Sequence, residues 1–367
     1  MEFIKGMDLS TLPEVEECGG HFYNKGIESD ALSILKEYGA NYVRIRLWND
    51  PYSETGEPYG AGTNDLECCI KLAKRVKSQG LKFLLDIHYS DFWADPGKQI
   101  TPKAWQGMDA DELTGAVYEF TYETLVALEK EGVSPDMVAV GNELTNGLLW
   151  PLGKVPEYAN IARFLSAGIK AVREKCPGVP VMLHLDNGGN NELYVRWFTK
   201  YFENGGEDFE YIGLSYYPFW HGDFKALEFN MRDIIERFHK DLIIAEVSMG
   251  FTMDDYAEYE KLGPDERKGY ATSKELVEKL DYPMTKQGQC DFMKRLCDIL
   301  KSLPENRGCG FFYWEPAWIP VPGSGWANEA ALRFTGEKGP GGNEWANQAL
   351  FDYDGNALPA LEVIRNI

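Results

Sequence analysis

The chain has 367 residues, of which 44% are hydrophobic, and its 37 basic and 58 acidic side chains give a formal net charge of -21. No apolar run approaches the roughly eighteen residues that a membrane span needs, and an acidic chain without a local Lys/Arg cluster disfavours nucleic acids, anionic lipids and uronate-rich polymers as partners. A neutral partner is favoured, although the same acid excess can serve solubility alone.

Short β-rich runs alternate with amphipathic helical stretches along the whole chain. The expected strands are Phe3–Met7, Tyr42–Leu47, Lys82–Ile87, Met137–Val140, Pro180–Leu185, Tyr211–Ser215, Leu242–Ala245 and Gly310–Tyr313. The expected helices are Ser29–Tyr38, Asn64–Gln79, Asp109–Glu131, Pro156–Lys175, Asn191–Glu203, Phe224–Lys240, Gly288–Ser302 and Pro359–Arg365. Ser29, Asn64 and Asp109 are the expected N-caps of the first three helices, and a glycine follows each of these helices.

This alternation predicts an α/β fold, a single (β/α)₈ TIM barrel that spans residues 1–367 with long βα loops forming a cleft. A doubly wound open sheet is the alternative, but no Gly-x-Gly-x-x-Gly follows the first strand. Gly- and Pro-rich stretches follow strands, as at Asn49–Gly62 and Pro316–Asn343, where a barrel has its active face.

Most tryptophans are expected at strand ends or in the loops that follow them. They are Trp48, Trp93, Trp105, Trp150, Trp220, Trp314, Trp318, Trp326 and Trp345. Sugar rings stack their apolar faces on indole rings, so this clustering indicates a carbohydrate cleft. The alternative is that these side chains pack the loops onto the barrel rim.

Two acidic residues lie at the carboxyl ends of apolar strands. Glu143 ends the fourth expected strand and Glu246 the seventh, so both are expected in the mouth of the barrel. A retaining glycosidase needs such a pair about 5 to 5.5 Å apart, one carboxyl group protonated as acid and one ionised as nucleophile. The charge of Glu246 should raise the pKa of Glu143, which makes Glu143 the expected acid. The alternative is that either residue only pairs with an arginine.

Arg44 and Arg46 alternate on the second strand and therefore share one face. Buried guanidinium groups need carboxylate partners, and Glu246 and Asp86 are the expected ones. Their expected role is to keep the nucleophile ionised and oriented, and a purely structural salt-bridge layer is the alternative.

Three of the five histidines, His88, His184 and His221, lie at or just beyond strand ends. No His-x-His or His-x-x-x-His spacing supports a metal site. We therefore expect these imidazoles to bond sugar hydroxyl groups.

Five long motifs resemble the endo-β-1,4-galactanases of glycoside hydrolase family 53, and the resemblance extends over essentially the whole chain. The motifs occupy Asn41–Pro51, Asp86–Lys98, Val140–Gly147, Ser215–Gly222 and Phe312–Pro320. The resemblance implies a TIM barrel with acid/base and nucleophile on strands four and seven. It also implies a neutral substrate, β-1,4-galactan or type I arabinogalactan, and a retaining endo-hydrolase.

The resemblance further assigns roles to single residues. It implies that Asn142 bonds the 2-hydroxyl of the sugar beside the scissile bond, and that Arg44 and Tyr217 support the nucleophile. It implies that Trp314 floors the cleavage subsite. Neighbouring sugars would contact Trp93, Trp220 and His221.

Two segments depart from the family pattern. Val247–Thr252 differs from the usual Thr-Ser-Tyr-type run, so contacts near the seventh loop are expected to differ. Some bacterial members of the family resemble calcium binders in the next segment, but Met253–Glu260 lacks their alternating Asp, His and Asn ligands. We therefore expect no calcium and no cofactor.

Two rival functions remain open from the sequence. A retaining endo-glycanase of the same clan would act on mannan, glucan or xylan. A polysaccharide-binding barrel without activity would keep the aromatic cleft, but it gains nothing from two close, dry carboxyl groups.

The chain contains seven cysteines: Cys18, Cys68, Cys69, Cys176, Cys290, Cys297 and Cys309. They include no Cys-x-x-Cys pair, so we expect buried free thiols rather than a zinc site or a disulfide framework. The N-terminus lacks the regions of a signal peptide. We expect a cytoplasmic monomer if the chain is complete as given, and a secreted one if an export signal has been removed.

Overall fold

Eight parallel strands close into a barrel in the computed structural model, which describes residues 2–256, 274–338 and 341–367. The order around the barrel is β1-β10-β9-β8-β7-β6-β5-β4, so each strand pairs with the next barrel strand along the chain. The strands are β1 (Ile4–Asp8), β4 (Tyr42–Leu47), β5 (Lys82–Ile87), β6 (Met137–Val140), β7 (Val181–Leu185), β8 (Tyr211–Tyr216), β9 (Asp241–Val247) and β10 (Gly308–Tyr313). The predicted TIM barrel is confirmed.

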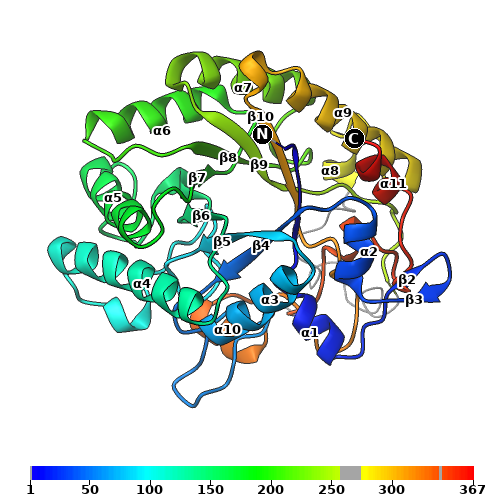
Figure 1. Ribbon diagram of the computed structural model, residues 1–367, viewed down its shortest axis with the longest axis horizontal. Coiled ribbons are helices and arrows are strands. Elements are labelled where there is room, and N and C mark those ends of the chain that lie inside the picture. Colours follow the sequence, from blue (N-terminus) through cyan, green and yellow to red (C-terminus); the bar gives the residue numbers. More distant parts are fainter. Residues whose placement is uncertain (1, 257–273, 339–340) are drawn as a thin grey trace.

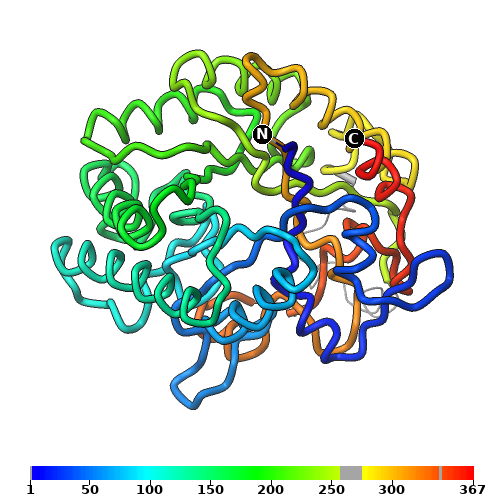
Figure 2. Tube along the Cα trace, in the orientation of Figure 1, coloured from blue at the N-terminus to red at the C-terminus, as the bar shows by residue number. Residues whose placement is uncertain are grey.

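Helices between the strands surround the barrel as an outer ring (Figure 1). They are α2 (Ala31–Glu37), α3 (Leu66–Ser78), α4 (Ala110–Lys130), α5 (Tyr158–Lys175), α6 (Asn191–Glu203), α7 (Phe224–Phe238), α9 (Lys286–Lys301) and α11 (Ala360–Arg365). The trace in Figure 2 runs once around this ring, and α11 packs beside α9 near the end of the chain.

Short elements within the loops were not expected from the sequence. They are α1 (Leu12–Glu17), the hairpin of β2 (Tyr23–Asn24) and β3 (Ile27–Glu28), η1 (Lys103–Trp105), η2 (Leu144–Asn146), α8 (Lys274–Val277), η4 (Pro304–Asn306), α10 (Glu329–Thr335) and η5 (Ala346–Gln348). Seven of these nine segments have two to four residues, about one helical turn or less, which is too short to show a hydrophobic period.

Two of the expected N-caps are wrong by one residue. Asp30 caps α2 by accepting from the backbone N–H of Ser33, and Asp65 caps α3 in the same way. Asp109 does cap α4, and with Glu112 it forms a complete capping box. A carboxylate satisfies the free N–H groups and also interacts favourably with the positive end of the helix dipole.

The core has two layers. Apolar side chains on one face of each strand pack against the helices, and those on the other face fill the barrel interior, where Tyr42, Met182 and Phe312 belong to one buried cluster. A Cβ atom on Gly6 would lie 2.2 Å from the ring of Phe312, so glycine is required at this position of β1. The interior is therefore filled below the mouth, and a site is possible only at an end.

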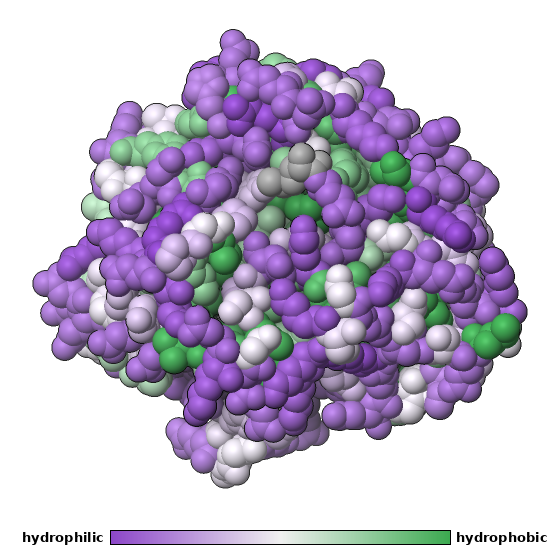
Figure 3. Space-filling view, viewed as in Figure 1, coloured by the Kyte–Doolittle hydropathy of each residue, from purple (hydrophilic) through white to green (hydrophobic). Residues whose placement is uncertain are grey.

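The face of the molecule in Figure 3 is mainly hydrophilic, with hydrophobic residues in small separate groups. None of the helices in the described ranges has the length and apolar character needed to cross a bilayer. All seven cysteines are free and five of them are buried, as expected.

Candidate active site

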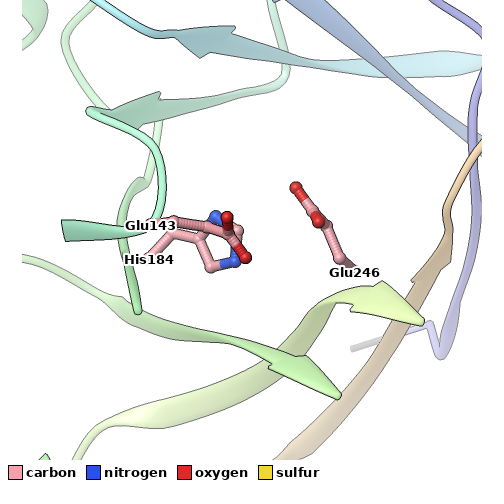
Figure 4. Close-up of side chains that lie close together, drawn as sticks. All are labelled: Glu143, His184 and Glu246. Atoms are coloured by element: carbon pink, nitrogen blue, oxygen red, sulfur yellow. The ribbon is translucent and has the colours of Figure 1, made fainter. Parts of the chain in front are cut away.

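Two glutamates face each other across the mouth of the barrel. Glu143 follows β6 and occupies the N-cap position of η2, whereas Glu246 lies near the end of β9. Figure 4 shows Glu143 and His184 on one side and Glu246 on the other, with the two carboxyl groups turned toward the space between them. One oxygen of each carboxyl group and a ring nitrogen of His184 all lie within 4.8 Å of one another.

The backbone at Glu143 is strained. Its φ of 46° lies in the left-handed region, which residues other than glycine rarely adopt. Gln99 stabilises this turn, because its side-chain amide donates to the carbonyl oxygens of Asn142 at 2.8 Å and Glu143 at 3.3 Å. The turn aims the carboxyl group of Glu143 into the mouth.

Glu246 is held by a cation and a phenol. Nη2 of Arg44 lies 2.8 Å from Oε1 of Glu246, and the hydroxyl of Tyr217 donates to Oε2 over 2.8 Å. The guanidinium of Arg44 also donates to Asp8 at 2.8 Å and to Asp86 at 2.7 Å. These contacts fix both oxygens of Glu246 in place.

The carboxyl group of Glu143 is held by a neutral hydroxyl group instead. The hydroxyl of Ser215 lies 2.6 Å from its Oε1. Asp186, which Thr145 and Asn187 hold by hydrogen bonds, lies on the same side of the mouth and is buried.

The two carboxyl groups consequently differ in acidity. Burial raises the pKa of Glu143 well above its ordinary value, and the charges of Glu246 and Asp186 raise it further, against the hydrogen bond from Ser215. Burial also raises the pKa of Glu246, but Arg44 and Tyr217 lower it. Glu143 is therefore the carboxyl group that keeps its proton to the higher pH.

The carboxyl pair opens into a cavity of about 560 Å³ at the mouth of the barrel. Four indole rings form a wall along it, in the order Trp93, Trp314, Trp345 and Trp220, with successive ring centroids 6.3, 5.6 and 5.4 Å apart. Trp220 is 44% exposed, so a flat apolar face is available to a ligand.

The profile of glycosyl hydrolase family 53 matches residues 4–364. The chain belongs to this family. It is 36% identical to the endo-beta-1,4-galactanase of Bacillus subtilis (strain 168), in an alignment that covers 99% of this chain and 86% of the relative. It is 35% identical to a probable arabinogalactan endo-beta-1,4-galactanase A of Aspergillus fumigatus (strain ATCC MYA-4609 / CBS 101355 / FGSC A1100 / Af293), over 86% of this chain and 84% of the relative.

Among solved structures, the family 53 catalytic domain of Ignisphaera aggregans superposes with a TM-score of 0.90 and 39% identity, over 99% of this chain and 96% of that domain. The resemblance inferred from the five motifs is therefore confirmed, and the chain is a glycosidase.

Most of the expected site residues line one cavity, the one that contains the carboxyl pair. Those that line it are His88, Trp93, Asn142, Glu143, Tyr217, Trp220, His221, Glu246 and Trp314. Of the strand-end tryptophans, Trp318, Trp326 and Trp345 also line it. Trp48 is buried, and Trp105 and Trp150 line a separate cavity, so the expected cleft includes six of the nine.

Arg44 and Asp86 lie behind the cavity wall. Both side chains are 0% exposed and are absent from the cavity lining, so they contact Glu246 and its partners rather than a ligand in the cavity. Burial opposes ionisation of Asp86, but Arg44 and His88 lower its pKa to about 2.

Arg46 does not use the expected carboxylates. Its Nη1 lies 2.7 Å from Glu315 and 3.3 Å from Asp8, and its guanidinium lies 4.3 Å from the ring centroid of Trp93. The two arginines share Asp8 at the end of β1, but Arg44 otherwise contacts Asp86 and Glu246, whereas Arg46 contacts Glu315. Asp8 and Glu315 could have been found by the rule that identified Glu143, since each is an acidic residue at or just beyond a strand end.

Two of the three histidines expected to bond sugar hydroxyl groups use both ring nitrogens for contacts within the protein. His88 uses Nε2 toward Asp86 at 3.0 Å and Nδ1 as acceptor for Trp48 and the backbone of Ala94. Both ring nitrogens of His184 also have protein partners. His221 bonds the backbone of β8 through Nδ1 and lines the cavity.

Ser215, Gln99 and Asp186 were not among the site residues expected from the sequence. Asp186 directly follows β7 and carries the same signal as Glu143. Ser215 and Gln99 are neutral polar residues, and no pattern in the chain separates them from other serines and glutamines. The segment Met253–Glu260, where no calcium is expected, lies partly outside the described residues, at 257–260.

Proposed function

We propose that this family 53 chain hydrolyses β-1,4-galactosidic bonds within galactan and type I arabinogalactan, with retention of anomeric configuration. Family membership and the names of the relatives support the substrate. The observation that carries the chemistry is the pair of buried carboxyl groups with oxygens within 4.8 Å. This spacing favours direct attack by one of them, because an inverting pair stands about 6.5 to 9.5 Å apart.

In the first step, Glu143 donates its proton to the glycosidic oxygen while an oxygen of Glu246 attacks the anomeric carbon. The bond to the leaving sugar breaks, and a covalent galactosyl-enzyme forms. Arg44 and Tyr217 support this step because they keep Glu246 ionised and oriented.

In the second step, the Glu143 carboxylate accepts a proton from water as that water attacks the anomeric carbon. The bond to Glu246 breaks, and both carboxyl groups return to their starting states. This sequence needs no cofactor.

The cavity supplies the proposed contacts with the polymer. Asn142 bonds the 2-hydroxyl of the sugar at the cleavage point, and Trp314 forms the floor beneath it. Trp93, Trp220 and His221 contact the neighbouring sugars. A chain with a net charge of -21 suits an uncharged polymer.

A hydrolysis panel tests this proposal. Purified enzyme is incubated with β-1,4-galactan, mannan, xylan and glucan, and products are separated by chromatography. We expect short galacto-oligosaccharides from galactan at early times and little product from the other polymers. Glu246→Gln removes the proposed nucleophile and should abolish galactan hydrolysis. Glu192→Gln, at a side chain 91% exposed on α6, is its matched control and should keep full activity. Faster hydrolysis of another polymer would refute the substrate.

A further inference from the structure

A chain of hydrogen-bonding groups links Arg44 to Glu143. Nη2 of Arg44 donates to Oδ1 of Asn142 over 2.8 Å, and the same oxygen lies 2.8 Å from Nδ1 of His184. Nε2 of His184 lies 2.8 Å from the hydroxyl of Ser215, which lies 2.6 Å from Oε1 of Glu143. All five side chains are buried, and buried polar groups are as a rule hydrogen-bonded.

The orientation of Asn142 determines which nitrogen of His184 carries a proton. Nδ2 of Asn142 donates to the carbonyl of Ala94 over 2.8 Å, and its Oδ1 accepts from Arg44, which has no acceptor atom. Because Oδ1 can only accept, Nδ1 of His184 must be the donor in the contact between them.

His184 is also neutral. Burial lowers its pKa well below the ordinary value, and Arg44 lowers it further, while Asp86 acts in the opposite direction. A neutral imidazole with a proton on Nδ1 has only a lone pair on Nε2. The hydroxyl of Ser215 must therefore donate to Nε2.

A serine hydroxyl has a single proton, so Ser215 then presents a lone pair to Glu143. The 2.6 Å contact between them is a hydrogen bond only if Glu143 carries the proton and donates it. An ionised Glu143 would instead require Ser215 to donate to it, which leaves two lone pairs facing each other between Ser215 and His184.

We propose that Ser215 and His184 form a hydroxyl switch that follows the protonation state of Glu143, an inference that rests on the proposed function. While Glu143 is protonated, the O–H of Ser215 points to Nε2 of His184. When substrate is bound, the O–H of Glu143 turns from Ser215 to the glycosidic oxygen and gives up its proton there, and the O–H of Ser215 then rotates and donates to the new carboxylate. It rotates back when Glu143 takes a proton from water in the second step.

No proton passes along the switch, because only the O–H bond of Ser215 changes direction. Ser215 and His184 are therefore positioning residues rather than catalytic residues. Among the described residues, the other titratable groups that interact with Glu143 or His184 are Arg44, Asp86, His88, Asp95, Asp186, Tyr194, Tyr217, His221 and Glu246. They stay unchanged in the variants below.

Two substitutions should shift the pH profile of kcat/KM on galactan in opposite directions. Ser215→Ala removes the donor to the carboxylate, so the pKa of Glu143 rises and the upper limb moves up by about one pH unit. His184→Asn keeps a donor toward Asn142 but removes the acceptor for Ser215, so Ser215 donates to Glu143 in every state. The upper limb should then move down by about one pH unit.

Matched variants separate the switch from a merely structural role. Ser215→Thr retains a hydroxyl and His184→Gln retains an acceptor near Nε2, so each should return the upper limb to its wild-type position. Lower activity with an unmoved limb in Ser215→Ala, or equal shifts of one sign in Ser215→Ala and His184→Asn, would overturn the proposal.

The wild-type enzyme gives a test that needs no variant to fold. Side-chain ¹⁵N NMR of histidine-labelled protein near neutral pH should show His184 with a proton on Nδ1 and none on Nε2. A proton on Nε2, or on both nitrogens, would contradict the switch. Absence of galactan hydrolysis by the wild-type enzyme would instead contradict the proposed function, and the NMR result would still report on the hydrogen-bond chain.

Discussion

The two sides of the barrel mouth hold the same side chain in unlike surroundings. Glu246 is 6% exposed and has Arg44 and Tyr217 against its two oxygens. Glu143 is 8% exposed and has the hydroxyl group of Ser215 against one oxygen, with Asp186 nearby. Equal burial thus gives different acidities, because the neighbours decide which charge state is stabilised. The difference between two glutamates, rather than either one alone, makes an acid and a nucleophile.

Removing each glutamate should give the largest effect. Glu143→Ala and Glu246→Ala should each lower kcat on galactan on the order of 10⁴-fold. The first variant loses proton transfer to the glycosidic oxygen, and the second loses covalent attack on the anomeric carbon. Azide should restore turnover of an activated aryl β-galactoside by both variants. We expect the α-azide from Glu246→Ala, since azide replaces the nucleophile, and the β-azide from Glu143→Ala. NMR of the products identifies the anomers, and the same anomer from both variants would contradict the assignment.

Removing Arg44 should make the acidity of Glu246 more like that of Glu143. Arg44→Met leaves Asp86 and Glu246 buried without their cation and leaves Asp8 with Arg46 alone, so the free energy of unfolding should fall by about 3–5 kcal/mol. The pKa of Glu246 should rise, which moves the lower limb of the kcat/KM profile to higher pH. Urea unfolding and a pH–rate profile measure the two effects.

The control for Arg44→Met is Arg75→Met, at an ion pair whose guanidinium is 29% exposed. A partly exposed pair should cost about 1 kcal/mol or less, and the pH profile should not move. Equal losses of stability in the two variants would show that burial of the charge cluster beside Glu246 has no special effect.

Low pH should remove the stabilising contribution of Asp86, which lies beside Arg44, the cation that contacts Glu246. The pKa of Asp86 is lowered to about 2, so its ionised form stabilises the fold above the ordinary value near 3.8. This contribution, about 2 kcal/mol, is lost as pH falls from about 4 to 2. Urea unfolding of wild type and Asp86→Asn at several pH values should therefore show a difference that shrinks toward pH 2. A constant difference would contradict this account.

The smallest expected effect concerns the aromatic wall. Trp220→Ala removes a 44% exposed indole from the cavity, so KM for galactan should rise about 10-fold with little change in kcat. Phe229→Ala, at a 61% exposed ring on α7 that does not line the cavity, is the matched control and should leave KM unchanged. A similar KM in both variants would argue against sugar stacking on Trp220.

Sequence patterns predicted the barrel strands to within a few residues, because each strand is a short apolar run with clear ends. They also placed Glu143 and Glu246 at the mouth, since the carboxyl ends of parallel strands meet at one end of a barrel. They failed where a partner comes from a distant segment. Arg46 meets Glu315 across 269 positions of the chain, and no local pattern foretells that contact.

The histidines show the same limit. His88 and His184 have the residue type and the position of sugar ligands, yet their ring nitrogens are used within the protein. Only the neighbours of a side chain determine whether its polar atoms remain available to a ligand.

By itself, the order of residues determined the fold, the family motifs and the two acidic side chains, because hydrophobic periodicity and motif identity are local properties. The tertiary structure decided which neighbours set the acidity of each glutamate, which of the two arginines contacts Glu246 and which tryptophans reach the cavity. Those properties depend on burial and on charges within a few ångströms, and folding brings such neighbours together from eight different strands and their loops.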